Sequence, residues 1–155
     1  MTLVFREEDA ELLTYSPTTT GRLLADNDDT GGSISAGRLS LGSGAEGGKP
    51  HYHARSTEVF YVLDGELEIM LDDRLERVGT GGLVVVPPLM PHAFGAPAGT
   101  HADLLIWITP GVQRFDYLRH LARVARGDIP PGSVAADPAT YDVCPVDRPL
   151  WSTTR

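Results

Sequence analysis

Four side chains of this 155-residue sequence have the types and the spacing that hold a metal ion: His51, His53, Glu58 and His92. His51 and His53 are two residues apart, so on a β-strand their imidazoles project to the same side. Glu58 follows a short connection and is expected at the start of the next strand, where it adds an anionic oxygen. His92 comes after the proline-rich segment 87–91, which is stiff enough to aim it. The spacing therefore predicts one shared metal site.

Three imidazole nitrogens and one carboxylate form a donor set for a divalent transition metal. Such a set suits Fe, Mn, Co, Ni, Cu or Zn, whereas Ca and Mg prefer shells made of oxygen alone. We expect one such ion per chain and leave its identity open. The set leaves a coordination position for water, substrate or dioxygen, and an open metal site is typical of catalysis. Glu58 is also the expected catalytic residue, because it can leave the ion and accept a proton from the substrate.

Other residues with reactive side chains have weaker patterns. His101 and His120 are expected on the surface or on a helix face, away from the metal. Ser56 has histidines nearby, but we assign those histidines to the metal, which argues against a serine hydrolase. Cys144 is the single cysteine and has no neighbouring histidine, so we expect a structural role for it.

The elements that would position these residues are short strands. From residue 20 onward, stretches rich in valine, isoleucine, leucine and aromatic residues alternate with turn residues. This rhythm is typical of an all-β sandwich or barrel, and it shows no strand–helix–strand alternation. The expected strands cover residues 22–25, 33–41, 58–63, 66–71, 75–78, 83–86, 92–94 and 102–109.

Two dipeptides predict how neighbouring strands connect. Asp64-Gly65 stands between two apolar runs, and an Asp-Gly pair in that setting predicts a tight hairpin. Asp72-Asp73 predicts a second hairpin one strand later. The region would therefore be a meander of three antiparallel strands.

The pattern divides the chain into four parts. Residues 1–19 lack a sustained period and are expected to form an arm that lies over something else. Residues 20–110 would form the barrel. In residues 111–127 the apolar positions are spaced for one helix face, so one helix is expected on the outside of the barrel. Residues 128–155 are expected to form an irregular tail.

The metal-site pattern resembles the two conserved motifs of the cupin superfamily. The spacing of the first motif is matched by His51, His53, Glu58 and Gly65, and that of the second by Gly81, Pro87 and His92. The resemblance covers about residues 20–109. It departs from the motifs at Ala45 and Leu89, where they have glycine, and at Ala96, where the second has asparagine. None of the three is a ligand.

The resemblance implies a cupin double-stranded β-helix, or jelly-roll barrel, followed by one C-terminal helix. The chain is also similar to small cupins described as quercetin-dioxygenase-like and to cupins that act as aromatic polyketide cyclases. Both groups handle flat phenolic substrates. We therefore expect a metal-dependent dioxygenase acting on a small phenolic, flavonol-like or enolisable carbonyl compound. A zinc- or other metal-dependent polyketide cyclase or isomerase, and a non-catalytic cupin that binds a small molecule, stay open.

Composition and charge limit which other partners the protein can have. The length and an apolar content of 41% fit one domain with its own core. The net charge of −8 argues against nucleic acid as a partner. Apolar runs such as 83–86 are far shorter than the roughly 20 residues of a membrane span, and charged residues in the first 13 positions argue against a secretory signal, so we expect a cytoplasmic protein. Open sheet edges and the family resemblance favour a homodimer.

Overall fold

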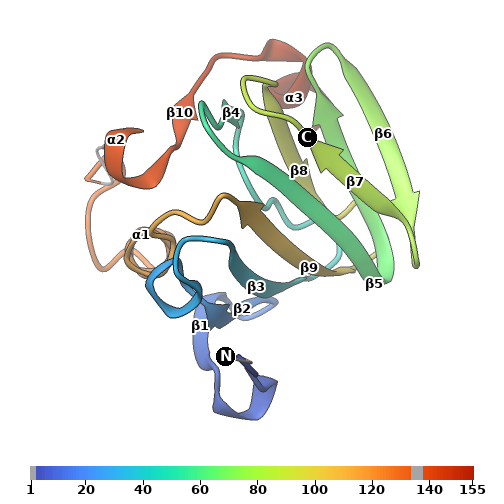
Figure 1. Cartoon of the computed structure of the whole chain (residues 1–155). Helices are drawn as coiled ribbons and strands as arrows, with labels where there is room; N and C mark the ends of the chain where they lie inside the picture. The colour runs from blue at the N-terminus through green and yellow to red at the C-terminus, as the bar shows by residue number, and fades with distance from the viewer. Residues whose placement is uncertain (1–2, 134–137) are drawn as a thin grey trace.

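The computed structural model describes residues 3–133 and 138–155, and its strands form an antiparallel sheet that curls into a barrel (Figure 1). The strands are β1 Glu11–Ser16, β2 Thr19–Ala25, β3 Ser35–Leu41, β4 His51–Tyr52, β5 Thr57–Leu71, β6 Arg74–Gly79, β7 Leu83–Val86, β8 His92–Gly95, β9 Ala102–Thr109 and β10 Cys144–Pro145. They follow the order β1-β2-β3-β9-β5-β8-β4-β10, with β6 and β7 attached to β5. The prediction of an all-β barrel with a C-terminal helix is confirmed.

The long strand β5 joins the two walls of the barrel. Its first half pairs with β7 and β9, and its second half pairs with β6 and β8. Its inward side chains alternate with outward ones and form the centre of the core, where Phe60, Val62, Leu67 and Ile69 have no exposed surface. Glu58 lies on this strand, next to that core.

The predicted hairpin at Asp64-Gly65 is wrong, because β5 runs through this dipeptide without reversing. Gly65 has a φ of +79°, and its neighbour Glu66 donates its N–H to the carbonyl of His101 at 2.9 Å. The pairing of β5 with β9 shifts register just before this point and then continues. The dipeptide therefore supplies the left-handed backbone of a β-bulge that bends the strand, and not that of a turn.

The hairpin predicted at Asp72-Asp73 is confirmed. Leu71 of β5 pairs with Arg74 of β6, which leaves a two-residue turn, and Asp72 has a φ of +54°. Such a residue at the first position of a two-residue turn matches the twist of the strands on either side.

The first 19 residues are more ordered than an arm. After a short 3-10 helix, η1 Glu7–Asp9, the chain forms β1, which pairs with β2 along its length. The charged residues that surround the apolar pair Leu12-Leu13 concealed this strand in the sequence. A second short 3-10 helix, η2 Asp28–Thr30, connects β2 to β3.

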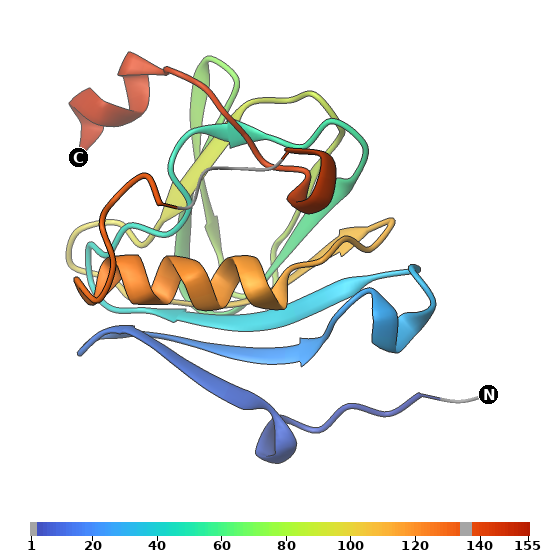
Figure 2. The same ribbon diagram turned by 90° about the vertical axis from the view of Figure 1, so that its left-hand side faces the viewer.

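Helix α1, Phe115–Ala125, starts four residues later than the prediction and packs on a different surface. Its side chains pack with Leu13 and Leu23 of the first two strands. The strand registers place Leu13, Gly21, Leu39, Leu104 and Val62 in one row. The helix therefore covers the same face of the sheet that lines the barrel interior, and not its outside (Figure 2).

The segment after α1 is not irregular throughout. It contains the short helices α2 Pro138–Tyr141 and α3 Pro149–Thr154, and β10 pairs with β4. Trp151 of α3 is buried against Met70 and Ala93. The tail is thus a structural part of the barrel. Within the described ranges, none of the helices has the length and apolar character needed to cross a membrane.

Candidate metal centre

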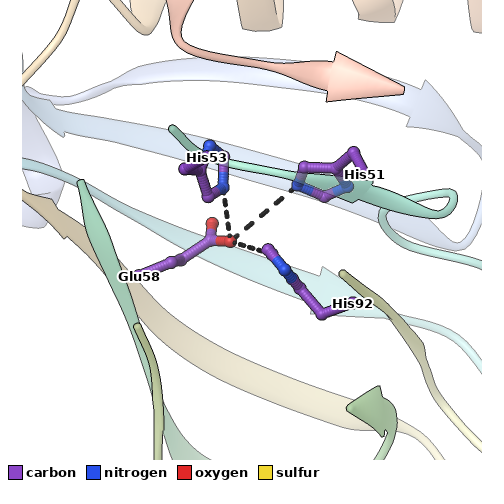
Figure 3. A group of neighbouring side chains, drawn as sticks. All are labelled: His51, His53, Glu58 and His92. Atoms are coloured by element: carbon purple, nitrogen blue, oxygen red, sulfur yellow. Dashed lines mark hydrogen bonds and ion pairs between the residues drawn. The ribbon is translucent and has the colours of Figure 1, made fainter. Parts of the chain in front are cut away.

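The four predicted ligands meet around one carboxylate oxygen (Figure 3). The Oε2 atom of Glu58 lies 2.7 Å from Nε2 of His92, 3.0 Å from Nε2 of His53 and 4.0 Å from Nε2 of His51. All donor atoms lie within 4.8 Å of one another, close to the span of about 4.2 Å between ligands on opposite sides of one ion. The His51 side chain is 12% exposed, and the other three are buried.

Three strands bring these side chains together. His51 begins β4 and pairs directly with His92, which begins β8. His53 follows β4 and is buried, while Tyr52 between them is directed elsewhere. Glu58 is the second residue of β5, paired with Ile108 on one side and Val86 on the other. The expected alternation along the histidine strand and the expected place of Glu58 at a strand start are both observed.

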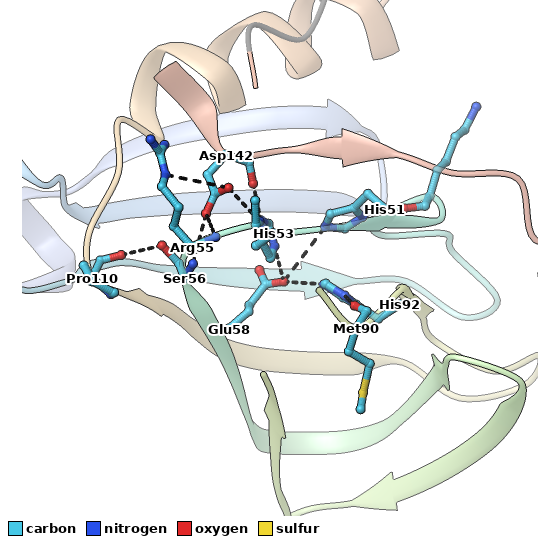
Figure 4. A network of polar contacts seen from close by, with 11 residues as sticks. His51, His53, Arg55, Ser56, Glu58, Met90, His92, Pro110 and Asp142 are labelled. Carbon is cyan, nitrogen blue, oxygen red and sulfur yellow. Dashed lines mark hydrogen bonds and ion pairs between the residues drawn. The ribbon is translucent and has the colours of Figure 1, made fainter. Parts of the chain in front are cut away.

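Backbone carbonyl groups fix the orientation of each imidazole. The Nδ1 atoms of the three rings face the carbonyl oxygens of Lys49 (2.6 Å from His51), Asp142 (2.6 Å from His53) and Met90 (2.9 Å from His92) (Figure 4). A carbonyl oxygen only accepts, so each Nδ1 carries a proton. In a neutral ring the Nε2 atom is then an unprotonated electron-pair donor.

This arrangement fits a cation and little else. The three Nε2 lone pairs converge on the oxygen of Glu58, which also carries lone pairs, so the four groups repel one another unless a positive charge lies between them. Extra protons are a poor alternative, because burial and the nearby His92 lower the pKa of His51 to about 3. Burial alone would raise the pKa of Glu58, but His53 and His92 hold it well below its usual range. A divalent ion satisfies all four groups at once.

Comparison with known proteins identifies the type of domain. Residues 37–109 match the family model described as Cupin domain. The chain thus has the domain signature and the fold of a small cupin. Among the curated proteins, its sequence has no match.

Solved cupin structures share the fold. An RmlC-like cupin from Shewanella frigidimarina NCIMB 400 is 26% identical, with a TM-score of 0.58, over 71% of this chain and 90% of that one. The polyketide cyclase RemF from Streptomyces resistomycificus is 20% identical, with a TM-score of 0.57, over 81% of this chain and 98% of that one. The Streptomyces nucleoside dehydratase Pac13 is 19% identical, with a TM-score of 0.57, over 75% of this chain and 88% of that one.

One departure from the cupin motifs places a non-glycine residue in a strained backbone conformation. Leu89, which replaces the glycine of the second motif, has a φ of +71°, in the left-handed region that glycine adopts without strain. Its N–H donates to the carbonyl of His53 at 2.7 Å. The loop before His92 therefore keeps the backbone geometry that the motif encodes, although a leucine occupies the position.

Asp142 supports the centre and was not predicted. Its carboxylate is buried and accepts the backbone N–H groups of Ala54 (2.7 Å), Arg55 (3.1 Å) and Ser56 (3.0 Å). These residues form the connection between His53 and Glu58, so one side chain from the tail holds the loop between two ligands (Figure 4). No local sequence pattern reveals such a contact, because its partners are 86 to 88 positions away.

A cavity of about 790 Å³ opens next to the centre. Glu58 and His51 contribute to its wall, and the side chains around them are mostly apolar or aromatic. Three polar residues that also line the cavity were missed by sequence reasoning: Tyr15, Arg114 and Tyr117. The helical period contained part of this signal, because Arg114, Tyr117 and Leu121 are spaced for one helix face.

The remaining candidates lie outside the centre. His101 contacts Asp64 at 2.8 Å on the surface, and His120 lies 3.3 Å from Ser133. The Ser56 hydroxyl donates to the carbonyl of Pro110 at 2.8 Å, so it is not held as a nucleophile against a histidine. Cys144 lies in β10, opposite Tyr52. The structural role of this cysteine stays a prediction.

Proposed function

We propose that this cupin is an enzyme that holds one divalent transition metal with His51, His53, Glu58 and His92. The observation that carries the proposal is the fixed tautomer of three imidazoles whose Nε2 atoms converge on one carboxylate oxygen. The substrate would be a small phenolic or enolisable carbonyl compound, because the adjoining cavity is large, mostly apolar and lined by the same centre.

Glu58 is the proposed proton acceptor. Both of its hydrogen-bond contacts use Oε2, and no described residue bonds to Oε1. In its ionised form this carboxylate can take a proton at Oε1 from a hydroxyl or from a carbon next to a carbonyl. The bound metal would supply Lewis acidity toward the substrate oxygen and, if it is a redox-active ion, reactivity toward dioxygen. The apolar wall would exclude bulk water from the charge formed on the substrate.

The first form of this proposal is a dioxygenase, and the second is a cyclase or isomerase. Both begin with the same proton transfer and differ in whether the ion undergoes redox chemistry. The second form is favoured by the similarity to RemF, a polyketide cyclase that is covered along 98% of its length. Zinc would select the second form, because zinc does not change oxidation state.

The deciding experiment is elemental analysis of the purified chain, with His51→Ala and the surface variant His101→Ala beside the wild type. We expect about one transition-metal atom per chain in the wild type and in His101→Ala, and a loss of that metal in His51→Ala. Iron, manganese, nickel or copper would then justify measuring oxygen consumption with a flavonol. Stoichiometric zinc would favour the cyclase or isomerase. A wild type that takes up no metal on reconstitution would contradict the proposal and leave a binding protein.

We also propose that the chain forms a homodimer. β7 pairs only with β5 among the described residues, so its other edge is open. Beside it, Tyr61, Leu83 and Val85 expose apolar surface on the outer face of the sheet, and residues 3–5 of the arm are apolar and exposed as well. Sedimentation of the wild type and of Leu83→Glu would test this. A wild type that sediments as a monomer would overturn it.

A further inference from the structure

The cavity next to the metal centre is also lined by a second polar group, which consists of Arg114, Tyr117 and Tyr15. The guanidinium carbon of Arg114 lies 5.1 Å from the centre of the Tyr117 ring, one helical turn away. The backbone of Arg114 is fixed independently of its side chain, because its N–H donates to the Asp26 carboxylate at 2.9 Å. The cationic group is therefore held at the cavity wall by the start of α1.

Among the described residues, no carboxylate forms an ion pair with the side chain of Arg114. Its Nη1 atom has no exposed surface and no hydrogen bond to any described residue. Most other arginines within the described ranges form an ion pair with an aspartate or a glutamate, namely Arg22, Arg38, Arg55, Arg74, Arg77, Arg119, Arg126, Arg148 and Arg155. A partly buried and unpaired guanidinium is costly, and an anionic ligand is the partner that removes this cost.

The two tyrosines add neutral hydrogen-bond donors. Burial raises the pKa of Tyr15 to about 12, and burial also raises the pKa of Tyr117, with Arg114 offsetting part of each shift. Both phenols therefore keep their protons near neutral pH. A phenol and a guanidinium both donate and together suit a carboxylate or another oxyanion.

We propose that the ligand of this cavity carries an acidic group, a carboxylate or an equivalent oxyanion, which pairs with Arg114. Its phenolic or carbonyl oxygen would then face Glu58 and His51, which line the same cavity. The orientation toward the metal rests on the function proposed above, whereas the pairing with Arg114 rests on its own geometry. The substrate class is thereby an aromatic acid and not a neutral phenol.

Calorimetry with two matched probes tests this inference: 6-hydroxy-2-naphthoate, which has a carboxylate remote from its hydroxyl, and 2-naphthol, which lacks it. We expect the wild type to bind the acid tighter by about tenfold or more, as one charge-assisted hydrogen bond provides. Arg114→Gln should remove this preference. Arg123→Gln, an exposed arginine on the same helix, should retain it. The Arg114 variant should stay folded because the N–H that Asp26 accepts belongs to the backbone.

The titrations are repeated on chelator-treated protein to separate the two proposals. A preference for the acid that depends on Arg114 and persists without metal supports this inference even if no metal is ever bound. A wild type that binds both probes equally, or neither, overturns the inference even if the metal centre is occupied. The inference is also overturned if Arg114→Gln keeps the full preference for the acid.

Discussion

The backbone carbonyl of Asp142 accepts a hydrogen bond from Nδ1 of His53 at 2.6 Å, although the two residues are 89 positions apart. The same residue uses its buried carboxylate to hold the three backbone N–H groups that follow His53. Its own φ of +53° lets both groups face the ligand loop. The C-terminal tail therefore orients the metal centre directly.

We expect Asp142→Ala to lower the free energy of unfolding by on the order of 2–4 kcal/mol, because three backbone N–H groups, one buried and two partly buried, lose a charged acceptor. Metal affinity should fall by about 10- to 100-fold as the loop relaxes. Urea titration and competition with a chelator measure the two effects. Asp142→Asn keeps one acceptor oxygen, so it should lose less of the free energy of unfolding and less of the metal affinity. Asp73→Ala, at an exposed turn, is the control, and an equal loss there would refute the role of Asp142.

Leu89→Gly should stabilise the protein by about 0.5–1 kcal/mol. The glycine relieves roughly 1–2 kcal/mol of left-handed strain, and the greater freedom of the unfolded chain takes back part of that gain. The leucine side chain is 65% exposed, so little packing is lost. Thermal unfolding of Leu89→Gly and Leu89→Ala separates strain from packing, since alanine keeps the Cβ atom. Equal stability of the two variants would count against strain at this position.

The ion pair between Arg38 and Asp103 should make the free energy of unfolding depend on pH in the acid range. The hydrogen bond from Arg38 lowers the pKa of Asp103 below its usual value. The ion pair therefore contributes fully to the free energy of unfolding above about pH 3.9, the pKa of Asp103 in the unfolded chain. This contribution disappears as the pH falls through the pKa of Asp103 in the folded protein. Solvent screens the pair, so we expect up to about 1 kcal/mol. Urea unfolding should separate wild type from Asp103→Asn at pH 7 and not at pH 2. A gap that is constant with pH would argue against the pair.

Gly65→Ala should destabilise the barrel by on the order of 2–4 kcal/mol. A Cβ atom on Gly65 would lie 2.0 Å from the carbonyl oxygen of His101, and the φ of +79° would be strained as well. Gly79→Ala is the matched control, because a Cβ atom there would contact nothing within 4 Å. Chemical denaturation of both variants measures the difference. A tolerated Gly65→Ala would mean that the bulge can repack.

Local patterns predicted the parts of the fold that depend on local chemistry. Strands 83–86 and 102–109 are found at their predicted bounds because alternation and flanking turns define them. The Asp-Gly dipeptide gave a wrong hairpin prediction because it favours a left-handed backbone, and that backbone occurs in a β-bulge as well as in a turn. The four ligands were predictable from spacing along strands, whereas Asp142 and Arg114 act on partners that only the folded chain brings near. Contacts between residues so far apart in the chain produce no periodic pattern in the sequence.

The ligands also differ in how firmly the chain holds them. Glu58 lies inside β5, with a strand paired at several positions on each side, whereas His51 belongs to β4, a two-residue strand that pairs with β8 at one position and with the equally short β10. Opening of that thin edge would release two imidazoles and leave the core closed. We therefore expect amide hydrogens of β4 to exchange much faster than those of β5. Uptake and loss of an ion would then proceed through a partial opening, on a timescale separate from global unfolding.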